Sequence, residues 1–245
     1  MDSTKNGNQI KIKVWDLPTR LFHWLLVTVF VFQFVTGDIL DDAMQLHFYG
    51  GYVALGLILF RIIWGMVGSY HARFTSFLAS PVTAWQYMRG KSQTHRYLGH
   101  NPLGAYSVLA LLAVMLTQAV SGLFMTDEIF SQGPYYSAVS SEVADIMNWL
   151  HHQAFSLLWY LIALHLIAIA YYRIKKKQKL VKAMFTGNKE VDEKQSNQLE
   201  IAGSARNIKT HWLRFLIVVA LVVLAVYLIV EVLPPAPEPG LYDYY

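Results

Sequence analysis

Histidine is the side chain in this 245-residue chain best able to bind a metal or a haem, because the chain has no cysteine. The absence of cysteine removes disulfides, iron–sulfur clusters and covalently attached c-type haem together. Some of the nine histidines lie within or at the ends of long apolar stretches, where a polar ring is costly unless it has a partner. We expect these histidines to be ligands: His23, His47, His151 or its neighbour His152, and His165.

The remaining histidines have a weaker case. His71, His95 and His100 lie in a polar segment between two apolar stretches, and His211 lies at the start of the last one. Water or lipid head groups can solvate a ring at such positions. We therefore do not expect these four to be ligands.

The elements that must position the histidines are membrane-spanning helices. The chain is 55% hydrophobic and only 15% charged, with a mean hydropathy of +0.33, which leaves too little polar surface for a soluble globule. No run alternates polar and apolar residues as a transmembrane strand would, so we expect an all-α membrane protein. Five stretches approach the roughly 20 residues that a bilayer requires: 21–38, 48–67, 103–125, 150–172 and 212–233.

The distribution of basic residues predicts how these helices are oriented. Every Lys and Arg except Arg61 falls in the N-terminal arm, in 68–102 or in 173–214. The positive-inside rule places these regions in the cytoplasm, with the N-terminus inside and the C-terminus outside. The net charge of +4 therefore reflects membrane topology, and we expect no nucleic-acid partner.

Helix geometry places two of the histidines on one face. His151 and His165 are 14 residues apart, which turns a helix by about 1400°, roughly 40° short of four full turns. His152 is turned from His165 by roughly 140°, so we favour His151 as the ligand. The 14 residues also rise by about 21 Å, so this helix offers one ligand near the outer surface and one in the inner half of the bilayer.

Depth then selects the partners. His47 begins the second span on the outer side, and His23 lies near the inner start of the first span, three residues after Arg20. An imidazole nitrogen must approach a metal to about 2 Å, so His47 pairs with His151 and His23 pairs with His165. This favours two bis-histidine haems stacked along the membrane normal. The alternatives are lone rings bonded to backbone carbonyls, or ligands to zinc or copper.

Arg61 is the only Lys or Arg within an apolar span, and a buried guanidinium requires an anion. No carboxylate is evident at that depth, which favours a propionate of the inner haem as its partner. The alternative is an Arg61 side chain that extends toward the cytoplasmic head groups.

The expected organisation has four parts. The first four spans carry the expected ligands, and 191–211 form a cytoplasmic linker. A fifth transmembrane helix covers 212–233, and 234–245 form a proline-rich periplasmic tail. The whole polar stretch from Arg173 to Lys209 is typical of a mobile linker.

Four segments carry a family resemblance. They read VWDLPTRLFHW at 14–24, LHFYGGY followed by FRIIWG up to 65, YLGHNPLGAYSVLALL at 97–112 and NWLHHQAFSLLWYLIALHL at 148–166. Over residues 14–190 the chain resembles the bacterial cytochrome b561 family, which is grouped with the b-type cytochrome subunits of nickel-iron hydrogenases. The resemblance implies two b haems on a four-helix core, bound by His23, His47, His151 and His165.

The resemblance also implies a function. It is electron transfer across a bacterial inner membrane, between the quinone pool and a periplasmic redox partner such as a cytochrome c. The haems would carry the reaction, and we assign no bond-making step to a side chain. The fifth helix and the tail depart from the simplest members, which keeps open a membrane anchor subunit of a hydrogenase-like complex and a quinone reductase acting on a small oxidant such as superoxide. From another class, a membrane transporter or metal permease is the alternative.

Overall fold

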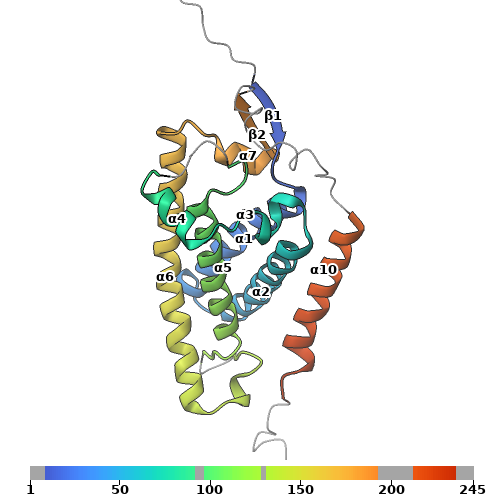
Figure 1. Cartoon of the computed structure of the whole chain (residues 1–245). Helices are drawn as coiled ribbons and strands as arrows, with labels where there is room; N and C mark the ends of the chain where they lie inside the picture. Colours follow the sequence, from blue (N-terminus) through green and yellow to red (C-terminus); the bar gives the residue numbers. More distant parts are fainter. Residues whose placement is uncertain (1–8, 92–96, 128–130, 193–211, 236–245) are drawn as a thin grey trace, which may run out of the picture. The chain divides into compact units, whose positions relative to one another are not determined.

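The computed structural model describes residues 9–91, 97–127, 131–192 and 212–235. Within them, five helices are long and apolar enough to cross a membrane. They are α1 (Leu17–Phe34, continued to Ile39 by a π-helical turn), α2 (Met44–Val67), α5 (Pro102–Gly122), α6 (Ser141–Ile174) and α10 (Trp212–Tyr227, continued to Val232 by a second π-helical turn) (Figure 1). The expected all-α membrane architecture is confirmed.

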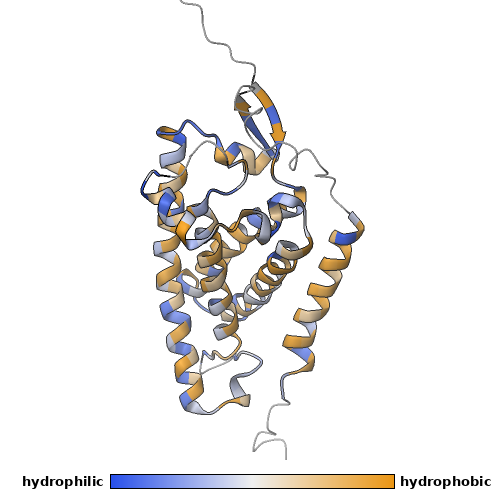
Figure 2. Ribbon diagram, in the orientation of Figure 1, coloured by the Kyte–Doolittle hydropathy of each residue, from blue (hydrophilic) through white to orange (hydrophobic). Residues whose placement is uncertain are grey.

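Helix α6 is longer than predicted. Its apolar part was expected at 150–172, but the helix begins at Ser141 and has 34 residues. Glu142 in the first turn complements the positive end of the helix dipole, which favours helix in this polar stretch. Polar residues are visible in α6 in Figure 2, whereas α10 is hydrophobic over most of its length. Because α6 begins at Ser141, His151 lies about three turns inside this helix rather than at its start.

A small antiparallel sheet was not predicted. Strand β1 (Gln9–Lys13) pairs with β2 (Asn188–Asp192), and β2 follows helix α7 (Leu180–Thr186). The expectation that no run alternates was wrong for Gln9–Lys13, whose isoleucines and polar residues do alternate. The expectation that the linker begins at Arg173 was also wrong, because α7 and β2 occupy its first part. The rest of that linker (193–211, including His211), His95 and tail residues 236–245 lie outside the described residues.

The structure divides into two compact units, and each long helix contributes residues to both. Unit 1 comprises Met1–His23, Arg61–Ala110 and Leu161–Phe215. It contains the sheet and three short helical segments, which are a 3-10 turn (Tyr70–Ala72), α3 (Phe74–Phe77) and α4 (Pro81–Met88). A small core in this unit joins the residues after β1 to α7 and consists of Val14, Trp15 and Ala183.

Unit 2 comprises Trp24–Phe60, Leu111–Tyr160 and Leu216–Tyr245. Trp159 of α6 holds Phe30 and Phe34 of α1 edge to face, at ring-centre distances of 5.4 and 5.2 Å. A 3-10 turn (Tyr136–Ala138) precedes α6. The sequence of unit 2 contains no Lys or Arg, so every basic residue of the chain belongs to unit 1.

Candidate haem-binding sites

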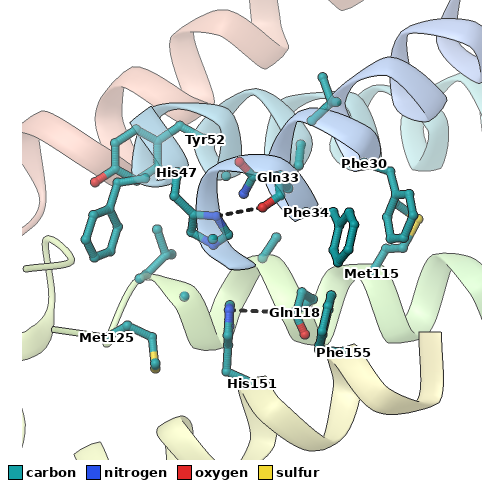
Figure 3. A pocket seen from close by; sticks show the side chains of 18 of the residues that line it. Phe30, Gln33, Phe34, His47, Tyr52, Met115, Gln118, Met125, His151 and Phe155 are labelled. Carbon is teal, nitrogen blue, oxygen red and sulfur yellow. Dashed lines mark hydrogen bonds between the residues drawn. The ribbon is translucent and has the colours of Figure 1, made fainter. Parts of the chain in front are cut away.

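Two of the expected ligands face each other in unit 2. His47 from α2 and His151 from α6 have ring centres 6.4 Å apart, with their planes inclined by 72° (Figure 3). A metal binds an imidazole nitrogen at about 2 Å and each ring centre lies about 1 Å behind it, so two axial rings on one metal have centres about 6 Å apart. The observed spacing fits one metal ion between the two rings.

Polar groups on neighbouring helices orient both rings. His47 Nδ1 lies 3.1 Å from the backbone oxygen of Gln33, and His151 Nδ1 lies 3.1 Å from Ser121 Oγ. A ligand histidine characteristically hydrogen-bonds through one nitrogen in this way while the other binds the metal. His151 Nε2 lies 2.8 Å from the amide nitrogen of Gln118, so Gln118 must turn aside before Nε2 can bind a metal.

Close packing of glycine against the rings supports a built site. A Cβ at Gly37 would lie 2.6 Å from the His47 ring, and one at Gly122 would lie 3.2 Å from the His151 ring. Beside the rings is a cavity of about 240 Å³, lined mainly by apolar side chains. Phe30, Phe34, Met115, Met125 and Phe155 are among those drawn in Figure 3. A flat macrocycle that is apolar except at its central metal matches a cavity of apolar side chains beside two imidazole rings.

The donor set fits a haem better than a structural zinc site. Within the described ranges, no group of three or more His, Asp or Glu side chains is placed to hold a metal ion. Structural zinc takes four protein ligands and catalytic zinc takes three. Two opposed imidazoles are instead the arrangement in which a tetrapyrrole supplies the remaining ligands.

His151 and His152 differ in placement, as the helix geometry predicted. His151 is half-buried and faces His47, whereas His152 is exposed and has its ring centre 6.3 Å from that of His151. His152 also lines the outer part of the cavity. The ligand role of His151 remains a prediction.

The other expected pair lies in unit 1. His23 on α1 and His165 on α6 are both half-buried and lie close enough for their charges to interact. One expected pair therefore lies in each unit, and the ligand roles of His23 and His165 remain a prediction.

Arg61 has only 3% of its surface exposed. A side chain that extended to the lipid head groups would be more exposed than this. The Arg61 guanidinium lies over the Phe74 ring at 4.8 Å. The expectation that no carboxylate lies at this depth was wrong, because buried Asp16 interacts electrostatically with Arg61. The sequence placed Asp16 before the first span, but the fold brings it beside α2.

Two histidines expected in solvent are packed into the protein instead, His71 buried and His100 half-buried. His71 is 8% exposed, and His100 packs between Trp15 and Phe77 with both ring centres at 4.7 Å. Burial, then the positive charges of Arg61, His71 and His165, lower the pKa of His100 to about 3. Burial and the charge of Lys189 also lower the pKa of His71. Both rings are therefore held in the neutral form at physiological pH.

Sequence reasoning missed Gln33, Gln118 and Ser121. Each is a polar residue inside an apolar stretch, which is the same signal that identified the histidines. The side-chain oxygens of Gln33 and Gln118 are buried and have no hydrogen-bond partner among the described residues. These amides are therefore available to a ligand in the cavity.

Comparison with known proteins agrees with this geometry. The family model for prokaryotic cytochrome b561 matches residues 14–187. Relatives named as probable Ni/Fe-hydrogenase B-type cytochrome subunits include those of Azotobacter chroococcum (26% identical, covering 75% of this chain and 90% of the relative) and Azotobacter vinelandii (24%, with the same coverage). A third, from Cupriavidus necator, is 24% identical and covers 74% of this chain and 88% of the relative. No solved structure matches the chain.

The family match covers well over half of the chain and contains all four candidate ligands. Haem b is the cofactor that this family implies, and the apolar helices agree with a multi-pass membrane protein. The chain belongs to the prokaryotic cytochrome b561 family, as a membrane b-type cytochrome of electron transfer.

Proposed function

We propose that this protein conducts electrons across a bacterial inner membrane through two bis-histidine b haems, between the quinone pool and a periplasmic redox partner. The observation that carries the proposal is the opposed pair of His47 and His151, with ring centres 6.4 Å apart beside an apolar cavity. The second haem would be held by His23 and His165, which are both half-buried in unit 1.

The chain's own residues have defined roles in this proposal. When bound, haem supplies the one-electron chemistry. The backbone oxygen of Gln33 and the hydroxyl of Ser121 orient the outer imidazoles, and Arg61 offers a buried cation to a propionate of the inner haem. Helix α6 contributes one proposed ligand to each site.

The proposed domain arrangement follows from these assignments. Residues 14–190 form the di-haem domain, which the family match over residues 14–187 supports. Residues 191–211 link it to a fifth transmembrane helix at 212–233, and 234–245 form a periplasmic tail. Of the linker and the tail, 193–211 and 236–245 lie outside the described residues.

The absorption spectrum of the purified full-length protein tests the proposal. We expect sharp reduced-minus-oxidised b-type bands and two haems per chain by pyridine haemochrome assay and protein quantification. One haem per chain would contradict the di-haem route. A folded, colourless protein would favour the transporter or metal-permease alternative.

The orientation that we propose has the N-terminus in the cytoplasm and the C-terminus in the periplasm. It is supported by the segregation of every Lys and Arg into unit 1. A periplasm-dependent reporter fused after Tyr245 should be active, and the same reporter fused before Met1 should be silent. The reverse result would contradict the proposed orientation of the two termini.

A second candidate is a subunit that anchors and serves a hydrogenase-like complex. The relatives' names favour it, since they are called Ni/Fe-hydrogenase B-type cytochrome subunits. The two candidates share the haem route and differ in whether the outer partner is permanently bound or diffusing. Native mass spectrometry of gently solubilised membranes distinguishes them, because a bound redox enzyme would add the mass of a second chain.

A further inference from the structure

A cluster of basic side chains lies in unit 1, with two members buried and two half-buried, and we call it the basic pocket. It consists of Arg61, His71, His100 and Lys189. Arg61 and His71 are 3% and 8% exposed. Lys189 Nζ donates to the backbone oxygens of Tyr97 and Leu98, and burial lowers the pKa of Lys189.

His100 is the centre of this cluster. Arg61, His71 and His165 lie near enough to lower the pKa of His100, and Lys189 lowers the pKa of His71 in the same way. The rings of Trp15 and Phe77 hold His100 in place, each with its centre 4.7 Å away. The pocket is therefore a preorganised structure that begins near a candidate haem ligand.

Three atoms of the pocket remain unsatisfied. Arg61 Nη1, His71 Nε2 and His100 Nδ1 are buried and have no hydrogen-bond partner among the described residues. No described carboxylate forms an ion pair with any member of the pocket. Both carboxylate oxygens of Asp16 are already used, by Thr19 N and Trp64 Nε1. Arg61 is a buried cation with a free donor, and the nearby carboxylate of Asp16 has both oxygens bonded elsewhere, which favours a further anion beside Arg61.

We propose that Arg61, His100 and His71 together form the carboxylate-binding pocket for the propionate groups of the inner haem. This inference rests on the proposed function, because it takes His165 as a ligand of that haem. It extends the role of Arg61 to two histidines that the sequence had placed in solvent. A guanidinium binds a carboxylate through charge-assisted hydrogen bonds, and a neutral imidazole can donate its one N–H to the same group.

Two forms of the cofactor test the proposal by their difference in affinity. The full-length chain would be made in a cell-free system without haem, inserted into nanodiscs, and titrated with haem b or with its dimethyl ester, in which both propionates are blocked. We expect Arg61→Gln and His100→Phe to weaken binding of haem b at one of the two sites by roughly tenfold or more, as for a lost charge-assisted hydrogen bond. Both variants should bind the dimethyl ester as the parent does.

The variants are chosen to separate binding from folding. His100→Phe keeps an aromatic ring between Trp15 and Phe77, and Arg61→Lys keeps the charge and should retain most of the affinity. Arg214→Gln is the control, because Arg214 donates to the backbone oxygen of Val67 on the surface of the same unit. The affected site should be the one that His165→Ala abolishes.

Other outcomes overturn the proposal. Equal weakening of haem b and the ester would show a structural role for the pocket, and unchanged affinity for both would place the propionates elsewhere. If the parent chain bound no haem at the site of His165, the proposed function itself would fail.

Discussion

The indole Nε1 of Trp64 donates a hydrogen bond of 3.0 Å to Oδ2 of Asp16, across 48 residues of sequence. The other carboxylate oxygen of Asp16 accepts from the backbone N–H of Thr19 at 2.9 Å, in the first turn of α1. Asp16 and Trp64 are almost completely buried, at 1% and 2% exposure. One carboxylate therefore caps α1 and ties it to α2 next to the candidate inner site.

Replacement of Asp16 should destabilise the protein. Asp16→Ala leaves the buried Trp64 N–H and the α1 cap unsatisfied, which we expect to cost about 1–3 kcal/mol. Thermal unfolding of the haem-loaded protein in detergent, followed by circular dichroism, should show a lower midpoint. Asp41→Ala is the control, since Asp41 is exposed and its loss should leave the midpoint unchanged. Equal midpoints for the two variants would contradict the role of Asp16.

Neighbouring histidines on α6 should differ in their effect on haem content. His151→Ala removes a ring that faces His47 and should remove the outer haem, leaving one haem per chain. His152→Ala should leave two, because His152 is exposed. Pyridine haemochrome assays on the two variants, with His165→Ala as the inner-site counterpart, measure this. Loss of a haem from His152→Ala alone would reassign the ligand.

The hydroxyl of Ser121 should matter to haem affinity. It lies 3.1 Å from His151 Nδ1 and 2.7 Å from the backbone oxygen of Thr117, so it can accept from the ring while donating to the helix. Ser121→Ala removes the acceptor that orients His151, and loss of such a partner typically costs about 10–100-fold in affinity. Haem titration of the variant measures the effect. Thr117→Val deletes a hydroxyl that, among the described residues, donates to the Ala113 carbonyl and not to a histidine, and this variant should bind haem normally.

Electron transfer to a soluble partner should slow as salt rises. Unit 2 contains acidic residues but no Lys or Arg. Its described acidic residues include Asp38, Asp41, Asp42, Glu142, Asp145 and Glu231. Such a surface steers a basic carrier over a Debye length that falls from about 30 Å at 0.01 M salt to about 8 Å at physiological ionic strength. Stopped-flow oxidation by a basic cytochrome c across salt concentrations measures this.

The competing explanation is that topology alone excludes basic residues from the outer side, with no partner implied. A rate independent of ionic strength would support that explanation. It would also favour a permanently bound partner, as the relatives' names suggest.

The sequence alone determined the membrane architecture and the family. An apolar stretch of sufficient length has to become a helix in lipid, because its backbone must satisfy its own hydrogen bonds. The 3.6-residue period is equally local, so the spacing of His151 and His165 predicted which of two adjacent rings faces inward. These inferences require no knowledge of any contact distant in sequence.

Only the tertiary structure decided which groups surround those histidines. The polarity of residues 68–102 correctly indicated a segment outside the apolar spans, yet His100 is half-buried there because Trp15, 85 residues earlier, and Phe77 pack against its ring. Ser121 and Gln118 reach His151 from another helix, and Asp16 lies near Arg61 through the meeting of α1 and α2. Local periodicity carries no information on such contacts, because they depend on which helix faces pack together.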